Sequence, residues 1–235
     1  MTAKPKIVVL TGAGISAESG IKTFRDADGL WENYPVADVA SADGFERNPA
    51  LVHRFYNERR RALADAEPNK AHTLLHELEK YFDVYIITQN VDDLHERAGS
   101  SNILHLHGEL TKVRAIDDEN LTFKLGYGGV TDPDTIIEGH KVRPHIVFFQ
   151  EAVPMFEPAT RLAVEADIFV IIGTSLAVYP AAGLSYYVRR GTPVYYIDPK
   201  PAEGIKGITV IRKPATEGVE ELCRLLIEKY IKPLP

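Results

Sequence analysis

Short apolar runs alternate along this chain with longer segments in which apolar residues recur every three or four positions. The apolar runs lie at 6–10, 81–88, 103–106, 167–172 and 193–197. Runs of this length are typical of strands buried on both faces of a parallel sheet. The segments with helical periodicity lie between the runs, at 49–66, 69–80, 156–166, 181–190 and 216–230. This alternation predicts an α/β fold with a parallel sheet and helices on both of its faces.

Two segments interrupt the alternation. The segment 27–68 is polar and largely helical with no expected strand, and the segment 111–144 is rich in turn-forming residues. We expect both to leave the sheet and together form a smaller lobe of one domain that spans residues 1–235. The main lobe then comprises about 1–26, 69–110 and 145–235, and a ligand is expected in the cleft between the lobes.

A glycine-bearing turn follows the first apolar run directly. Gly12, Gly14 and Ala17 have the G-x-G-x-x-A spacing of a dinucleotide-binding fingerprint, which makes the expected sheet Rossmann-like. A dehydrogenase fingerprint would continue into a long helix and place an acidic ribose ligand about 20 residues further on. Here a polar string follows instead, and Asp38, near that distance, ends no expected strand. The sequence therefore argues against a dehydrogenase that transfers hydride.

Polar groups also follow the other apolar runs directly. Ligands of parallel α/β sheets bind beyond the carboxyl ends of the strands, so residues at these positions are candidates for the binding site. Small, amide, imidazole and hydroxyl side chains gather there, at 11–14, 89–92, 106–109 and 173–175.

Composition narrows the function classes. The chain has 235 residues, 45% of them hydrophobic, and a net charge of -6, which disfavours nucleic-acid binding through a basic face. It has no run of about 18 apolar residues that would cross a membrane. The first strand follows the N-terminus without room for a signal peptide, and the single cysteine, Cys223, excludes an intrachain disulfide. We expect a cytoplasmic protein.

Five longer motifs occur in order along the chain: GAGISAESGIKTFRDADGLW, TQNVDDLHERAG, HLHGEL, RPHIVFFQE and GTSLAVYPAAGL. Together they resemble the sirtuins, the NAD-consuming protein deacylases, and the resemblance covers essentially the whole chain. It implies that NAD is consumed as a co-substrate and that the partners are acylated lysine side chains of proteins. The implied products are nicotinamide, O-acyl-ADP-ribose and free lysine.

The resemblance also implies roles for individual residues. His107 matches the general base, a task that suits imidazole because its pKa lies near neutrality, and Asn90 matches a second catalytic residue. The positions matched to cofactor binding are Gly12, Ala13, Gly14, Ala17, Glu18, Thr23, Phe24, Arg25, Trp31, Gln89, Asn90, Val91, Asp92, Gly173, Thr174, Ser175, Asp198, Pro199, Lys200 and Ala215. Those matched to substrate binding are Tyr56, Arg59, Val147, Phe148, Phe149 and Val178.

Tyr56 and Arg59 stand three residues apart, hence on one face of the expected helix. A phenolic hydroxyl and a guanidinium fork together could hold a carboxylate. The Tyr-x-x-Arg motif resembles the sirtuin subclass that removes succinyl and malonyl groups. The alternative is a solvated basic helix, which is what we expect of Arg60 and Arg61.

Three features depart from the family pattern. Most sirtuins bind a structural zinc through four cysteines, but the segment 111–144 contains none, so we expect no zinc. Gln150 stands where the family usually has glycine and could narrow the peptide channel. Asp198 stands where an asparagine usually contacts ribose, a change that still allows NAD binding.

His72 and His76 stand four residues apart on one expected helix and could share a metal ion, but we expect them to lie on a partly exposed helix face instead.

Alternatives remain open on the same fold. The acceptor could be a protein side chain or water, giving mono-ADP-ribosyl transfer or NAD hydrolysis. The chain could also be a non-catalytic NAD-sensing module, although a sensor has no need of a base such as His107 beside the ribose. A monomer is expected, because the segment 219–226, taken to be exposed, shows no self-complementary seam.

Overall fold

The computed structural model describes residues 4–22, 30–31, 34–202 and 207–231. Its central element is a six-stranded sheet, all of whose recorded pairings are parallel. The strands are β1 (Lys6–Thr11), β4 (Asp83–Thr88), β5 (Ile103–His105), β10 (Ile168–Ile172), β11 (Val194–Ile197) and β12 (Thr209–Ile211). β12 was not expected from the sequence.

The strand order is β12-β11-β10-β1-β4-β5. The chain moves from β1 outward to β4 and β5, and then returns to the other side of β1 for the remaining strands. This confirms the predicted Rossmann-like sheet. It also places the reversal of strand order between β1 and β10, where doubly wound sheets open a ligand crevice at the carboxyl ends of their strands.

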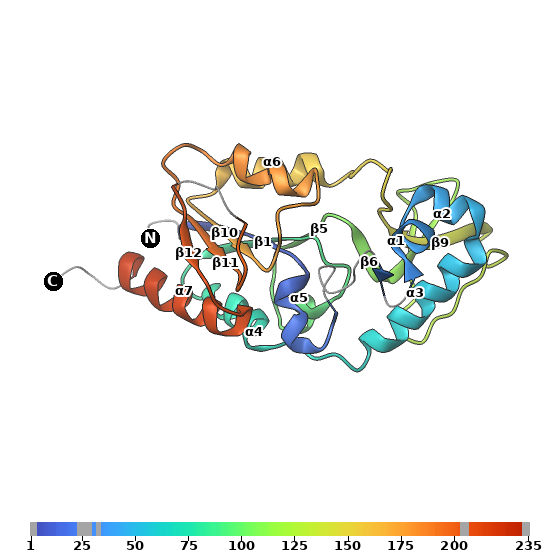
Figure 1. The fold of residues 1–235 in the computed structure, drawn as a ribbon, viewed down its shortest axis with the longest axis horizontal. Helices are drawn as coiled ribbons and strands as arrows, with labels where there is room; N and C mark the ends of the chain where they lie inside the picture. Colours follow the sequence, from blue (N-terminus) through green and yellow to red (C-terminus); the bar gives the residue numbers. More distant parts are fainter. Residues whose placement is uncertain (1–3, 23–29, 32–33, 203–206, 232–235) are drawn as a thin grey trace.

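Apolar side chains of β1 alternate between two separate cores. Ile7 and Val9 pack with α4 (Lys70–Leu78) and α7 (Ala215–Tyr230) on one face. Val8 and Leu10 pack on the other face with α6 (Phe156–Glu165) and the 3₁₀ helix η4 (Ala181–Tyr187). Figure 1 shows these helices on opposite sides of the sheet. Because both faces are covered, successive residues in the middle of β1 and throughout β10 are apolar, rather than only alternate ones.

The covering helices differ from the sequence predictions in two details. The segment 181–190, predicted to be helical, forms the 3₁₀ helix η4 over Ala181–Tyr187. The segment 219–226, expected to be exposed, is exposed on one side only, because α7 turns Val219, Leu222 and Leu226 onto the sheet. No described helix is long and apolar enough to cross a bilayer.

The smaller lobe combines helices with a second sheet (Figure 1). Its helices are α1 (Val36–Val39), α2 (Ala42–Arg47) and α3 (Pro49–Leu63). Its antiparallel strands β6 (Gly108–Ala115), β7 (Thr122–Lys124), β8 (Ile136–Ile137) and β9 (His140–Ile146) lie in the order β7-β6-β9-β8. The short pair β2 (Leu30–Trp31) and β3 (Tyr34–Pro35) contradicts the expectation of no strand in 27–68. The connecting elements are η1 (Ala13–Ile15), η2 (Ala17–Ser19) and α5 (Leu94–Arg97).

Helix α3 joins the two inserts. The Asn48 side chain accepts a hydrogen bond from Leu51 N, and proline occupies the first helical position, so the start of α3 is well defined. One side of the helix packs on β6 and β9 through Phe55 and Tyr56. Arg60 is completely buried in this contact, so the expectation that it is solvated is wrong.

His72 is also buried, contrary to the expected partly exposed face. Its ring is 0% exposed, packs edge-on against His95 and accepts a hydrogen bond from Asn69 N. The Asn69 side chain accepts from Ala71 N in return, so His72 completes the cap at the start of α4. His76, one turn later, has a side chain that is 42% exposed.

Burial of histidines links stability to pH. Burial lowers the pKa of His53, His72 and His145 to about 4, and it lowers the pKa of His95 as well. The folded protein keeps these rings neutral, whereas the unfolded chain protonates them below about pH 6.5. Their contribution to stability is therefore complete above that pH and is lost as the pH falls toward 4.

We expect His72→Gln to flatten this dependence. Glutamine can still accept the capping hydrogen bond but does not titrate. Between pH 6 and 4.5 the free energy of unfolding, measured by denaturant titration, should depend on pH less steeply, by up to about 1.4 kcal/mol per pH unit. The matched control is His76→Gln on the same helix. An unchanged slope in His72→Gln would contradict the assignment.

Candidate active site

The strand register brings four chain segments together. Thr11 is paired with Thr88 on one side and with Ile172 on the other, and Ile172 is paired with Ile197. The residues that follow these strands therefore meet at one edge of the sheet. A cavity of about 1060 Å³ opens there and extends to α3 and β9 of the smaller lobe.

Every described residue that the sequence assigned to a site lines this cavity. The set comprises Gly12, Ala13, Gly14, Ala17, Glu18, Tyr56, Arg59, Gln89, Asn90, Val91, Asp92, His107, Val147, Phe148, Phe149, Gly173, Thr174, Ser175, Val178, Asp198, Pro199, Lys200 and Ala215. Thr23, Phe24 and Arg25 lie outside the described residues, as does the side chain of Trp31. Residues not predicted include Ile21, Leu110 and Ile146, whose apolar side chains gave no signal beyond that of core residues.

Two turns touch backbone to backbone at the floor of the cavity. Gly14 N donates to Gly173 O at 2.8 Å, and Gly12 N donates to Ile172 O at 3.0 Å. A Cβ atom at Gly14 would stand 2.6 Å from Gly173 Cα, and Gly173 itself has φ +61°. Only glycine meets both demands. The turn therefore lines the cavity without side chains at positions 12 and 14, although the N–H groups of both glycines already donate within the fold.

A chain of buried polar groups supports Asn90. Its amide nitrogen donates to Gly12 O at 3.2 Å and to Ser16 Oγ at 3.1 Å. Ser16 Oγ donates in turn to Asp92 Oδ2 at 3.1 Å. Burial raises the pKa of Asp92, and hydrogen bonds from Leu94 and Ser16 oppose that shift. Sequence reasoning missed Ser16, although a hydroxyl within the glycine turn was an available signal.

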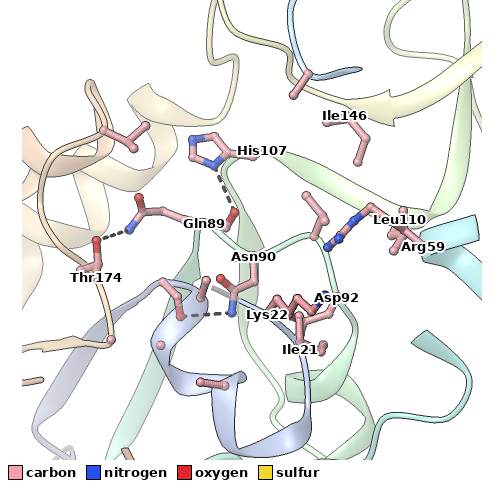
Figure 2. Close-up of a pocket in the computed structure, with 18 of the residues that line it drawn as sticks. Ile21, Lys22, Arg59, Gln89, Asn90, Asp92, His107, Leu110, Ile146 and Thr174 are labelled. Carbon is pink, nitrogen blue, oxygen red and sulfur yellow. Dashed lines mark hydrogen bonds between the residues drawn. The ribbon is translucent and has the colours of Figure 1, made fainter. Parts of the chain in front are cut away.

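His107 occupies the opposite side of the same cavity. Figure 2 shows Gln89 between His107 and Thr174: its carbonyl lies 3.1 Å from His107 Nδ1, and its amide donates to Thr174 Oγ1 at 3.2 Å. A carbonyl can only accept, so Nδ1 carries the proton and Nε2 keeps its lone pair. Burial lowers the pKa of His107 despite the bond to Gln89. The ring is therefore neutral near pH 7 and can accept a proton.

His105 lies two residues earlier and forms a second clamp. Its Nδ1 is 3.0 Å from Asn90 O, and its Nε2 is 2.8 Å from Glu96 Oε1. Burial lowers the pKa of His105, but the bonds to Glu96 more than offset this and leave the pKa raised. Consecutive carbonyls of Gln89 and Asn90 are thus each held by one histidine.

The smaller lobe closes the far end of the cavity with apolar and aromatic walls. Figure 2 shows Arg59 on the same side of the cavity as Leu110 and Ile146. Tyr56 is completely buried, with its ring centroid 5.9 Å from that of Phe148. Burial raises the pKa of Tyr56 far above neutrality, so its hydroxyl remains protonated and able to donate.

Gln150 is tied to α2. Its amide nitrogen donates to Asp43 Oδ2 at 2.7 Å, and Asp43 N donates to its amide oxygen at 3.2 Å. Gln150 holds φ +78°, a backbone conformation that suits glycine better, and the two bonds to Asp43 help to hold it there. Gln150 lines the cavity.

Comparison with known proteins identifies the family. The sequence pattern of the Sir2 family matches residues 12–180, which include most of the site described above. The chain belongs to the Sir2 family. An "NAD-dependent protein deacylase" of Bacteroides thetaiotaomicron is 57% identical over 94% of this chain and 97% of its own length. One of Helicobacter pylori, with the same description, is 51% identical over 94% and 97%.

Solved structures agree. A Sir2 homologue complexed with ADP-ribose has a TM-score of 0.86 and 38% identity, over 99% of this chain and 96% of that one. A Sir2 homologue complexed with NAD has a TM-score of 0.84 and 39% identity, over 96% and 90%. A Sir2 protein bound to an acetylated peptide has a TM-score of 0.77 and 29% identity, over 96% and 93%. Among the residues described in this chain, no group of three or more His, Cys, Asp or Glu side chains could hold a metal ion.

The contact between the two turns gives a direct test. Gly14→Ala must push Gly173 away, so we expect it to weaken binding of NAD, the co-substrate of the Sir2 family, at least tenfold, or about 1.4 kcal/mol. Gly128→Ala is the control, because a Cβ atom there would meet nothing within 4 Å. Isothermal titration calorimetry measures both. Wild-type affinity in a folded Gly14→Ala protein would show that the contact does not shape the NAD site.

Proposed function

We propose that this protein is an NAD-dependent lysine deacylase that removes acetyl and acidic acyl groups, such as succinyl and malonyl, from proteins. The general class, an NAD-dependent protein deacylase, follows from membership of the Sir2 family and from relatives of that description that align over nearly their whole length. The acyl preference and the residue roles rest on the geometry of the cavity.

The observation that carries the proposal is that one cavity joins three chemically distinct parts. The first is an open glycine backbone suited to a diphosphate, the second is a neutral imidazole, and the third is an apolar end with a tyrosine hydroxyl and a guanidinium. A co-substrate with phosphates and an acyl chain with a terminal carboxylate could occupy it together.

In this proposal each part has one task. NAD would supply the ribose: the carbonyl oxygen of the acyl-lysine would attack its C1′ as nicotinamide leaves, and one water would be consumed when the lysine amine is released from the acyl carbon. The backbone of the Gly12–Gly14 turn binds the diphosphate, and Gln89, Asn90 and Asp92 hold the nicotinamide ribose. His107 Nε2 takes the proton from a ribose hydroxyl as the acyl group moves onto that oxygen. The products are O-acyl-ADP-ribose, nicotinamide and free lysine.

The apolar end is proposed to choose the acyl group. An acetyl group needs only the aromatic and aliphatic wall formed by Phe148, Ile146 and Val91. A succinyl or malonyl group brings a carboxylate, which the Arg59 fork and the Tyr56 hydroxyl would bind by charge-assisted hydrogen bonds. Such bonds gain strength where they are shielded from water, and Tyr56 is completely buried.

His107→Ala should remove the base without disturbing the fold. We expect kcat for deacylation of acetyl and succinyl peptides to fall by at least about 100-fold, the usual contribution of general base catalysis. NAD should still bind, as calorimetry would show. Full activity in His107→Ala would disprove the proposed mechanism.

Arg59→Met should separate the two acyl classes. We expect kcat/KM for a succinyl peptide to fall at least about 30-fold, because a carboxylate would lose its charged partner, and that for the acetyl form to change less than about threefold. Mass spectrometry of one lysine peptide in both forms, with and without NAD, measures this. Arg61→Met, an exposed neighbour on α3, is the control. Equal losses on both peptides would refute the carboxylate grip.

A further inference from the structure

Helix α3 presents different residues to the cavity and to the second insert. Tyr56 and Arg59 line the cavity. His53, Asn57 and Arg60, which are separated by four and three residues and so share a face, point instead to the segment 129–131 and to β6. We call these three residues the anchoring face of α3.

Arg60 joins this face to both β6 and the segment 129–131. Its Nε donates to Leu110 O at 2.8 Å, and its Nη1 donates to Gly129 O at 3.0 Å and to Asn57 Oδ1 at 2.9 Å. The side chain is 0% exposed. Burial lowers the pKa of Arg60 to about 10, so the group stays charged at neutral pH. All of these acceptors are neutral, and no carboxylate of the described residues forms an ion pair with it.

Asn57 and His53 hydrogen-bond to Thr131, two residues after Gly129, through its backbone N–H, its backbone carbonyl and its hydroxyl group. The Asn57 amide donates to Thr131 O at 2.7 Å and accepts from Thr131 N at 3.1 Å, which satisfies both backbone groups. His53 Nδ1 lies 2.8 Å from Thr131 Oγ1. The anchoring face therefore fixes α3 against β6 and the segment 129–131, 50 to 78 residues away in sequence.

Burying the Arg60 guanidinium without an acidic partner among the described residues lowers the stability of the fold, so stability alone does not explain it. A buried charge without an acidic partner loses its hydration, and a well-packed apolar residue would often stabilise a fold as well or better. What the guanidinium supplies is a rigid fork that fixes direction. One of its acceptors belongs to Leu110, which lines the same cavity as Tyr56 and Arg59. The fork thus sets the distance between α3 and the opposite wall.

We infer that Arg60, supported by Asn57, is a positioning residue that sets acyl selectivity by fixing Tyr56 and Arg59 opposite the β6 wall of the cavity. The inference rests on the proposed function. A carboxylate held by a fork and a hydroxyl requires placement within about 0.5 Å, whereas an acetyl group in an apolar pocket tolerates more movement. Loosening α3 should therefore harm acidic acyl groups more than acetyl.

The test replaces the fork and keeps the charge. In Arg60→Lys we expect KM for a succinyl peptide to rise about tenfold, with kcat/KM for the acetyl form within about threefold of wild type. Arg61→Lys, the exposed neighbour, is the matched control and should change neither. Equal losses on both peptides would mean that Arg60 has a merely structural role, and unchanged selectivity would mean that it has none in positioning. Either result overturns the inference.

A second variant guards against failure of Arg60→Lys to fold, which circular dichroism would reveal. Asn57→Ala removes the partner of both Arg60 and Thr131, and the same loss of succinyl selectivity is expected. Arg59→Met, measured in parallel, distinguishes failure of the positioning inference from failure of the proposed acyl preference. If Arg59→Met loses selectivity while Arg60→Lys and Asn57→Ala keep it, the positioning inference fails and the proposed function stands. If Arg59→Met itself keeps selectivity, the proposed acyl preference fails, and the inference fails with it.

Discussion

The site depends first on the close contact between the turns that follow β1 and β10. Gly14 N meets Gly173 O at 2.8 Å, and neither residue can carry a side chain without moving the other. This contact can form only because β1 pairs in register with both β10 and β4, which brings the strand ends level. Asn90 then reaches Gly12 O, and Gln89 reaches Thr174. The floor of the cavity is thus set by backbone geometry, before any catalytic side chain is placed.

The smaller lobe is held in a different way. Its cysteine-free second insert has no thiolates to bind a metal, and in the described residues polar contacts join it to the rest of the chain. Arg143 donates to Glu151 at 2.6 Å and lies 4.0 Å from the Phe148 ring. Glu151 also accepts from Phe148 N at 2.8 Å. The ion pair therefore supports the same aromatic wall that faces Tyr56. Together with the anchoring face of α3, this ion pair makes the shape of the apolar end of the cavity depend on the packing of the smaller lobe.

The sequence predicted those features that depend on residues close together in the chain. Apolar runs located five of the six sheet strands, and the glycine spacing located the turn. Residues after strand ends predicted the cavity lining, because a parallel sheet aligns those ends whatever its connections are. Burial of polar side chains was missed. Arg60 looks solvated in an arginine-rich helix, and only partners 50 and 69 residues away bury it. His72 is hidden by packing against His95, which sequence spacing does not encode. The strands of the smaller lobe were missed because polar and charged residues interrupt their apolar positions, as in β6 and β9.

Removal from water has opposite effects on the ionisable groups of the cavity, and this gives each group a separate chemistry. Burial lowers the pKa of His107, because the charged form of imidazole is the protonated one, and so it leaves a base. The same burial raises the pKa of Tyr56, because its charged form is the deprotonated one, and so it leaves a donor. A guanidinium ordinarily holds its proton far above neutrality, so Arg59 brings a permanent positive charge to the same region. A single cavity can thus offer a proton acceptor at His107 and, under the proposed function, a carboxylate-binding site at Tyr56 and Arg59.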